Sequence, residues 1–127
     1  MSRRSAWAPP LVWAGLILVL GHLPPPIEPH ALFPHVDKIV HFSEYSVLGV
    51  LLVRATRGSE WSSPMAGAII LGLLFAIIDE AHQAWIPSRV SDMMDFAADG
   101  IGIIGGSLTQ SRLAALLALR RKRNIDP

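Results

Sequence analysis

Three segments of the chain carry polar and ionisable side chains at helical spacing within otherwise apolar sequence. Residues three, four or seven positions apart share one face of an α-helix, so each set would line a single face. The sets are Asp37, His41, Glu44 and Tyr45; Asp79, His82 and Gln83; and Asp92, Asp95 and Asp99. Carboxylates beside imidazoles transfer protons, and both groups also bind divalent cations. The pattern therefore indicates acid–base, metal or ligand-binding chemistry.

In a catalytic interpretation, a carboxylate orients a histidine, and that histidine acts as general base or acid. The candidate catalytic residues are His41, Glu44, Asp79, His82 and Asp99. The expected substrate-binding residues are Arg89, Gln83, Tyr45 and Asp95, with Arg89 offering a bidentate fork to a phosphate or carboxylate. A divalent metal is a candidate cofactor, because His-x-x-Glu and Asp-x-x-His each place two donors on one helix face. The sequence does not assign its ligands.

Known hydrolase motifs are missing from the sequence. There is no HExxH motif and no nucleophile elbow, which argues against a zinc protease and a serine hydrolase. Whether the protein is an enzyme is therefore left open. Besides an enzyme and a ligand-binding protein, a proton-coupled transporter is a third class of function. A transporter with only four short spans would have to form oligomers.

Several polar residues near these segments have simpler interpretations. Glu80 lies off the face shared by Asp79 and His82, so it is not expected to be a ligand. His22 lies near a predicted loop and belongs to no pattern. Asp37 either caps its helix or joins the site, while Lys38 is expected to extend toward the membrane interface.

Composition predicts a membrane protein with a single domain over residues 1–127. Hydrophobic residues make up 51% of the chain and charged residues only 17%, with a mean hydropathy of +0.42. Ordinary soluble domains are roughly one quarter charged. The chain has no cysteine, which excludes disulfide bonds and thiolate metal sites.

Four apolar stretches predict an all-α polytopic membrane protein with four transmembrane helices in a small bundle. They cover residues 6–23, 37–53, 64–85 and 92–109. At about 1.5 Å per residue, each approximates a bilayer core of about 30 Å. The second and fourth stretches are less apolar and are included because their polar residues recur at helical spacing. The first resembles a secretory signal, but no small-x-small cleavage site follows, so it is expected to remain as a span.

The distribution of basic residues predicts that both termini are cytoplasmic. Nine of the eleven Lys and Arg residues would lie on one side of a four-span arrangement, the cytoplasmic side by the positive-inside rule. They are Arg3, Arg4, Arg54, Arg57, Arg112, Arg120, Arg121, Lys122 and Arg123. Residues 112–127 form a basic cytoplasmic tail, in which 113–119 is either an interfacial helix or the end of the fourth span. Gly102, Gly105 and Gly106 favour close helix packing.

This topology places the three polar faces at the extracytoplasmic end of the bundle, in two layers. The outer layer, about 4–6 Å from the helix ends, contains His41, His82 and Asp95. The inner layer, about 9–11 Å from those ends, contains Glu44, Asp79 and Asp99. Placing several ionisable groups at the same depth in a membrane is costly unless they avoid lipid. We therefore expect these side chains to line one shared, partly hydrated cavity.

The order and spacing of the polar blocks resemble the VanZ-like membrane proteins over residues 35–106. The blocks are Asp37-Lys38-x-x-His41-Phe42-x-x-Tyr45, Asp79-Glu80-x-His82-Gln83 and Asp95-x-x-x-Asp99-x-x-Gly102. The resemblance implies a multi-pass protein of the bacterial cytoplasmic membrane. The family is named for an accessory protein in glycopeptide-antibiotic resistance.

The expected function is to bind or process an anionic lipid-linked envelope component in the polar cavity. The expected partners are the lipid bilayer and an anionic lipid headgroup or cell-wall precursor, with no nucleic acid and an unassigned oligomeric state. The alternatives are a non-catalytic binding or antibiotic-tolerance module and a structural protein whose polar network only holds the helices together. Polar contacts in membranes contribute on average about 0.6 kcal/mol each, so helix association alone is a weak reason for so many ionisable groups.

Overall fold

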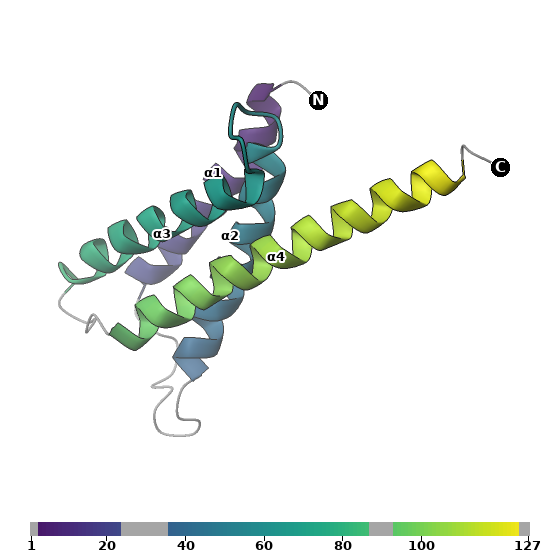
Figure 1. Ribbon diagram of the computed structural model, residues 1–127. Helices are drawn as coiled ribbons and strands as arrows, with labels where there is room; N and C mark the ends of the chain where they lie inside the picture. Colours follow the sequence, from purple (N-terminus) through teal and green to yellow (C-terminus); the bar gives the residue numbers. More distant parts are fainter. Residues whose placement is uncertain (1–2, 24–35, 87–92, 125–127) are drawn as a thin grey trace.

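Four α-helices make up most of the described chain (Figure 1). The computed structural model describes residues 3–23, 36–86 and 93–124. The helices are α1 (Arg3–His22), α2 (Val36–Thr56), α3 (Pro64–Gln83) and α4 (Met93–Arg123). The described residues contain no strand, so the prediction of an all-α protein is confirmed.

Three of these helices have the length and composition needed to cross a membrane. They are Ser5–His22 within α1, Pro64–Gln83 (α3) and Met93–Arg123 (α4), whereas α2 is not sufficiently apolar. Large apolar side chains cover the outside of α1 and α3, including Leu11, Val12, Ile77 and Ile78. Such extensive apolar exposure is typical of a protein that lipid surrounds.

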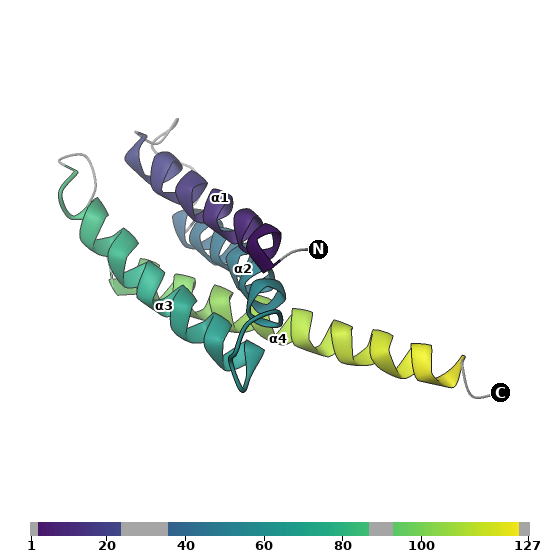
Figure 2. The same cartoon turned by 90° about the horizontal axis from the view of Figure 1, so that it is seen from above.

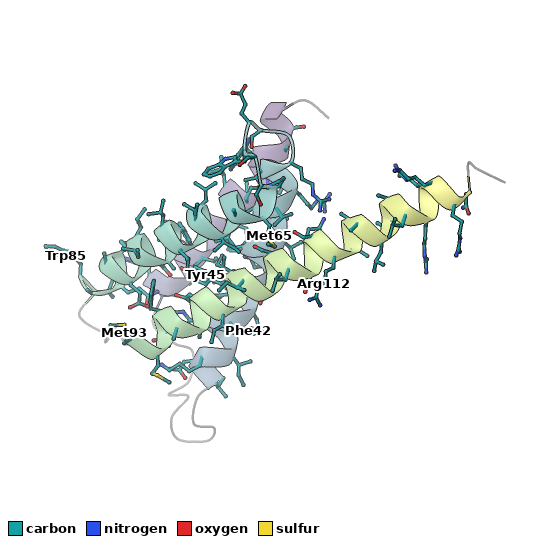
Figure 3. All side chains as sticks on the ribbon, in the orientation of Figure 1. Phe42, Tyr45, Met65, Trp85, Met93 and Arg112 are labelled. Carbon is teal, nitrogen blue, oxygen red and sulfur yellow. The ribbon has the colours of Figure 1, made fainter. Side chains whose placement is uncertain are left out.

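The α3 helix begins at the predicted residue for a local reason. Ser63 caps it by accepting a hydrogen bond from the Ala66 amide at 3.3 Å, and Pro64 occupies the start of the first turn. The helix ends at Gln83 rather than at the expected residue 85, and Trp85 beyond it is 87% exposed. Trp85 projects away from the bundle in Figure 3.

The α4 helix extends well past the predicted end at residue 109. It runs for 31 residues to Arg123, so the start of the predicted tail continues the same helix. Residues 110–123 contain neither Gly nor Pro and are rich in Ala, Leu and Arg, which favour helix. The four basic residues in the last turn also complement the helix dipole. This part of α4 projects beyond the other three helices in both orientations (Figures 1 and 2).

The α2 and α4 helices cross at a contact where their backbones nearly touch. A Cβ atom on Gly102 would lie 2.5 Å from the Phe42 carbonyl oxygen, and one on Gly106 would collide with the Ser46 carbonyl. A Cβ on Gly49 would lie 2.6 Å from the Ile103 carbonyl oxygen. Gly105, by contrast, faces open space, so the predicted packing role is confirmed for Gly102 and Gly106 but is wrong for Gly105.

The α2 helix packs more extensively against the other helices than any of them does, above all against α4, and therefore lies at the centre of the bundle. Its fully buried residues include Tyr45, Leu48 and Val53, which pack in the core with Ile103 of α4. The α1 helix attaches to α2 through Trp13, whose indole Nε1 donates to the Glu44 carbonyl oxygen at 2.9 Å. The central position of α2 allows its polar residues to face the neighbouring helices.

Candidate functional site

A histidine–carboxylate contact joins α2 and α4. His41 Nδ1 and Asp99 Oδ1 are hydrogen-bonded at 2.9 Å, with Asp99 fully buried and His41 only 8% exposed. Glu80 approaches the same pair from α3. One potential ligand atom from each of the three residues lies within 4.8 Å of the others. Three helices therefore contribute to one polar centre.

Asp79 forms a second buried group with residues of α2 and α3. The Tyr45 hydroxyl and the Gln83 amide donate to Asp79 Oδ2 at 2.9 and 3.0 Å. Tyr45 lies in the middle of the bundle in Figure 3. Gly21 of α1 closes over this group, because a Cβ there would lie 3.4 Å from Gln83 Nε2 and 3.8 Å from Asp79 Oδ1. The group thus involves α1 as well.

Lys38 pairs with two acidic residues at the beginning of α2 and α4. Its Nζ atom lies 2.5 Å from Asp95 Oδ1 and 2.9 Å from Asp37 Oδ2. The Lys38 side chain is only 19% exposed and turns toward these carboxylates, whereas the sequence favours a side chain extended toward the membrane interface. The attraction of Asp95 explains this difference, because a partly buried carboxylate is stabilised by a nearby cation.

Two histidines meet where α1 and α3 end. The His22 and His82 rings have centroids 5.7 Å apart. His82 Nδ1 is buried and has no hydrogen-bond partner among the described residues. One signal in the sequence could have identified His22: it lies at the end of the first predicted span, at the level of the other polar faces.

The expected pairing of polar layers differs from the observed contacts. His41, expected beside His82 and Asp95, instead contacts Asp99 of the inner layer. The difference corresponds to about one helical turn of displacement between α2 and α4. The helix-crossing register explains it, because Gly102 lies against Phe42 and Gly106 lies against Ser46.

The predicted site residues therefore have different placements. Contacts across or along the helices bring together His41, Tyr45, Asp79, Gln83, Asp95 and Asp99. Glu44 is half-buried and does not belong to the three-residue group around His41. Arg89 and Asp92 lie outside the described residues. Sequence reasoning missed Glu80, Lys38 and His22.

The chemistry available at this end of the bundle follows from its donors and its unpartnered atoms. Asp79 Oδ1, His82 Nδ1 and Asp99 Oδ2 are buried and lack hydrogen-bond partners among the described residues. Buried polar atoms usually have a partner, so such atoms commonly mark a binding site. The His41–Asp99 pair can hold and move a proton, and the carboxylates can bind a cation.

Comparison with known proteins places the chain in a family. No curated protein and no solved structure matches it. A family model described as VanZ/LLP1 matches residues 5–114, which include all of α2 and α3 and most of α1 and α4. The chain therefore belongs to the VanZ/LLP1 family.

Proposed function

We propose that all four helices cross a bacterial cytoplasmic membrane, α2 included. The low apolarity of α2 is compatible with this role because His41 and Tyr45 are buried against other helices. Polar residues inside a span are accommodated when they face the interior of a bundle. The α2 residues that remain exposed include large apolar ones suited to lipid: Ile39, Val40, Phe42 and Val47.

The basic residues support an orientation with the polar contacts on the extracytoplasmic side. Arg54 lies in the last turn of α2, at the end opposite the polar contacts, and Arg57 follows that turn. Four basic residues end α4. The chain lacks cysteine, so single cysteines report the orientation directly. In intact cells, a membrane-impermeant maleimide should label Trp85→Cys but not Ser59→Cys. The reverse labelling pattern would refute this orientation.

Within this topology, the polar end of the bundle binds the anionic headgroup of a lipid-linked envelope component. The observation that carries the proposal is the His22–His82 pair, in which His82 keeps a buried Nδ1 atom without a partner among the described residues. Imidazole N–H groups donate to phosphate or carboxylate oxygens. Arg89, which follows α3 in the sequence, is the second proposed anion-binding residue.

Acidic residues at this end would repel an anion unless their charge is compensated. Lys38 compensates Asp95, and a proton on His41 would compensate Asp99. Both contacts would lower the repulsion that an anionic ligand meets.

Two lipids that differ only in the presence of a phosphate group test this function. The full chain in phosphatidylcholine nanodiscs is titrated with a polyprenyl phosphate and with the corresponding neutral polyprenol, and binding is followed by native mass spectrometry. The phosphate should be required, and His82→Ala should weaken binding about tenfold, as expected for a lost charge-assisted hydrogen bond. Trp85→Phe is the control, since this exposed residue should not affect binding. Equal binding of both lipids would reject the proposal.

Acid–base chemistry on the bound lipid is a second candidate, favoured by the His41–Asp99 contact of 2.9 Å. A carboxylate that orients a histidine is a common catalytic arrangement. Release of inorganic phosphate from the polyprenyl phosphate over many turnovers, abolished in Asp99→Asn, would establish hydrolysis. Lipid binding without phosphate release would reject hydrolysis and leave the binding function intact.

A further inference from the structure

We propose that His41, Glu80 and Asp99 bind a divalent cation where α2, α3 and α4 meet. The proposal goes beyond headgroup binding and does not depend on it. One ligand atom from each residue lies within 4.8 Å of the other two. Donors bound to one cation at about 2.0–2.2 Å can be no more than about 4.4 Å apart. Small side-chain rotations would therefore complete the site.

The carboxylate of Asp99 provides an independent indication of a ligand. This residue is fully buried, and its Oδ1 atom contacts His41. Its Oδ2 atom is buried without a hydrogen-bond partner among the described residues. An unpartnered carboxylate oxygen is costly to bury, and a cation supplies the missing interaction.

The charge balance of this end of the bundle also favours a cation. The described residues include six carboxylates there, in Asp37, Glu44, Asp79, Glu80, Asp95 and Asp99. Lys38 is the one Lys or Arg residue of the described chain at this end, and it pairs with Asp37 and Asp95. Asp99 contacts His41 instead. A divalent cation would offset part of the remaining negative charge.

The donor atoms identify the class of ion. One imidazole nitrogen and two carboxylates suit first-row divalent ions such as Mn²⁺ and Zn²⁺. Mg²⁺ and Ca²⁺ prefer oxygen donors alone. In the metal-free protein, the His41–Asp99 hydrogen bond holds two of the ligands together, and the ion replaces the shared proton.

The structure favours Glu80 over Glu44 as the third ligand. Glu44 lies three residues from His41 on the same helix, and the sequence alone favours it. The close group of potential ligands instead contains Glu80, which comes from α3. The two glutamates therefore provide a direct test of the tertiary arrangement.

Metal titration of the purified full chain tests the proposal. The protein is treated with a chelator in neutral detergent, and Mn²⁺ binding is measured by electron paramagnetic resonance, with Zn²⁺ as competitor. We expect one saturable ion per chain. Glu80→Gln and Asp99→Asn should each weaken binding about tenfold or more, because each removes a charged ligand. Glu44→Gln and the matched control Glu60→Gln, in the exposed α2–α3 loop, should change the affinity less than about threefold.

Thermal unfolding separates ligand loss from misfolding. Mn²⁺ should raise the melting temperature of the wild-type protein but not that of Glu80→Gln, whose metal-free melting temperature should match the wild type. If Glu80→Gln does not accumulate, His41→Gln provides the same comparison. Wild-type protein without saturable binding, or equal losses in Glu44→Gln and Glu80→Gln, would overturn the proposed site. Phosphate-bearing lipids are absent from this experiment, so its outcome is independent of headgroup binding.

Discussion

The α2–α4 crossing and the polar end of the bundle hold the same two helices together by different means. At the crossing, Gly102 and Gly106 bring α4 against the backbone of α2. At the polar end, Lys38 and His41 of α2 pair with Asp95 and Asp99 of α4. The crossing depends on shape, because a side chain in place of hydrogen cannot fit. The polar end depends on charge, because each contact offsets the cost of burying an ionised group.

The glycine contacts and the polar contacts depend on the same register of α4 along α2. Gly102 lies against Phe42, while one turn away Asp99 contacts His41. The glycines therefore determine which carboxylate reaches the histidine. Substitutions at the crossing should chiefly affect folding, whereas those at the polar end should affect function with a smaller effect on stability.

Gly106→Ala should have the largest effect on stability. The added methyl group collides with the Ser46 carbonyl, which cannot rotate away, so we expect a loss of about 3 kcal/mol in the free energy of unfolding. Gly105→Ala is the matched control, since a Cβ there has no neighbour within 4 Å. It should be neutral or stabilising by up to about 1 kcal/mol. Unfolding in mixed detergent measures both, and equal effects would show that the crossing is not tightly packed.

Lys38→Met should have the next largest effect. It removes the cation beside Asp95, and because the pair is partly exposed we expect a loss of about 1–2 kcal/mol, between the values for surface and buried pairs. Adding Asp95→Asn should restore most of this stability by removing the buried charge. Without such rescue in the same unfolding assay, Lys38 would act through another contact.

A double-mutant cycle on Tyr45 and Asp79 should give a smaller coupling. Tyr45→Phe and Asp79→Asn both alter a hydrogen bond of 2.9 Å. Polar contacts of this kind in membrane proteins contribute about 0.6 kcal/mol on average and at most about 1.7 kcal/mol. Unfolding of both single variants and the double variant measures the coupling. Strictly additive effects would mean that the hydrogen bond contributes nothing to stability.

Trp13→Phe should have the smallest effect. It removes the indole donor to the Glu44 carbonyl, which connects α1 to α2, and should cost about 0.6 kcal/mol. Trp85→Phe is the control and should leave the unfolding curve unchanged, because this side chain is largely exposed. A loss above that of Lys38→Met would indicate that α1 has a larger role in stability than the polar end.

Much of the fold was predictable because helices and apolar stretches depend on local sequence. The predicted starts of the second, third and fourth spans lie within one residue of α2, α3 and α4. The end of α4 was not predicted, because hydropathy falls at residue 110 while helix propensity does not. The site was predictable only in part. Helical spacing identified Asp79 and Asp99, but it excluded Glu80, which meets His41 from another helix.

Local sequence specifies that the chain is helical, that it is apolar enough for a membrane, and that its ionisable residues gather on particular helix faces. These properties follow from composition and from residues at most seven positions apart. Which of those residues come into contact depends on how the helices pack. Contacts such as His41–Asp99 and Lys38–Asp95 join residues 57 or 58 positions apart, and they depend on the close approach of α2 and α4 at Gly102 and Gly106. A displacement of one turn there would exchange the partners, and helical periodicity alone does not specify that displacement.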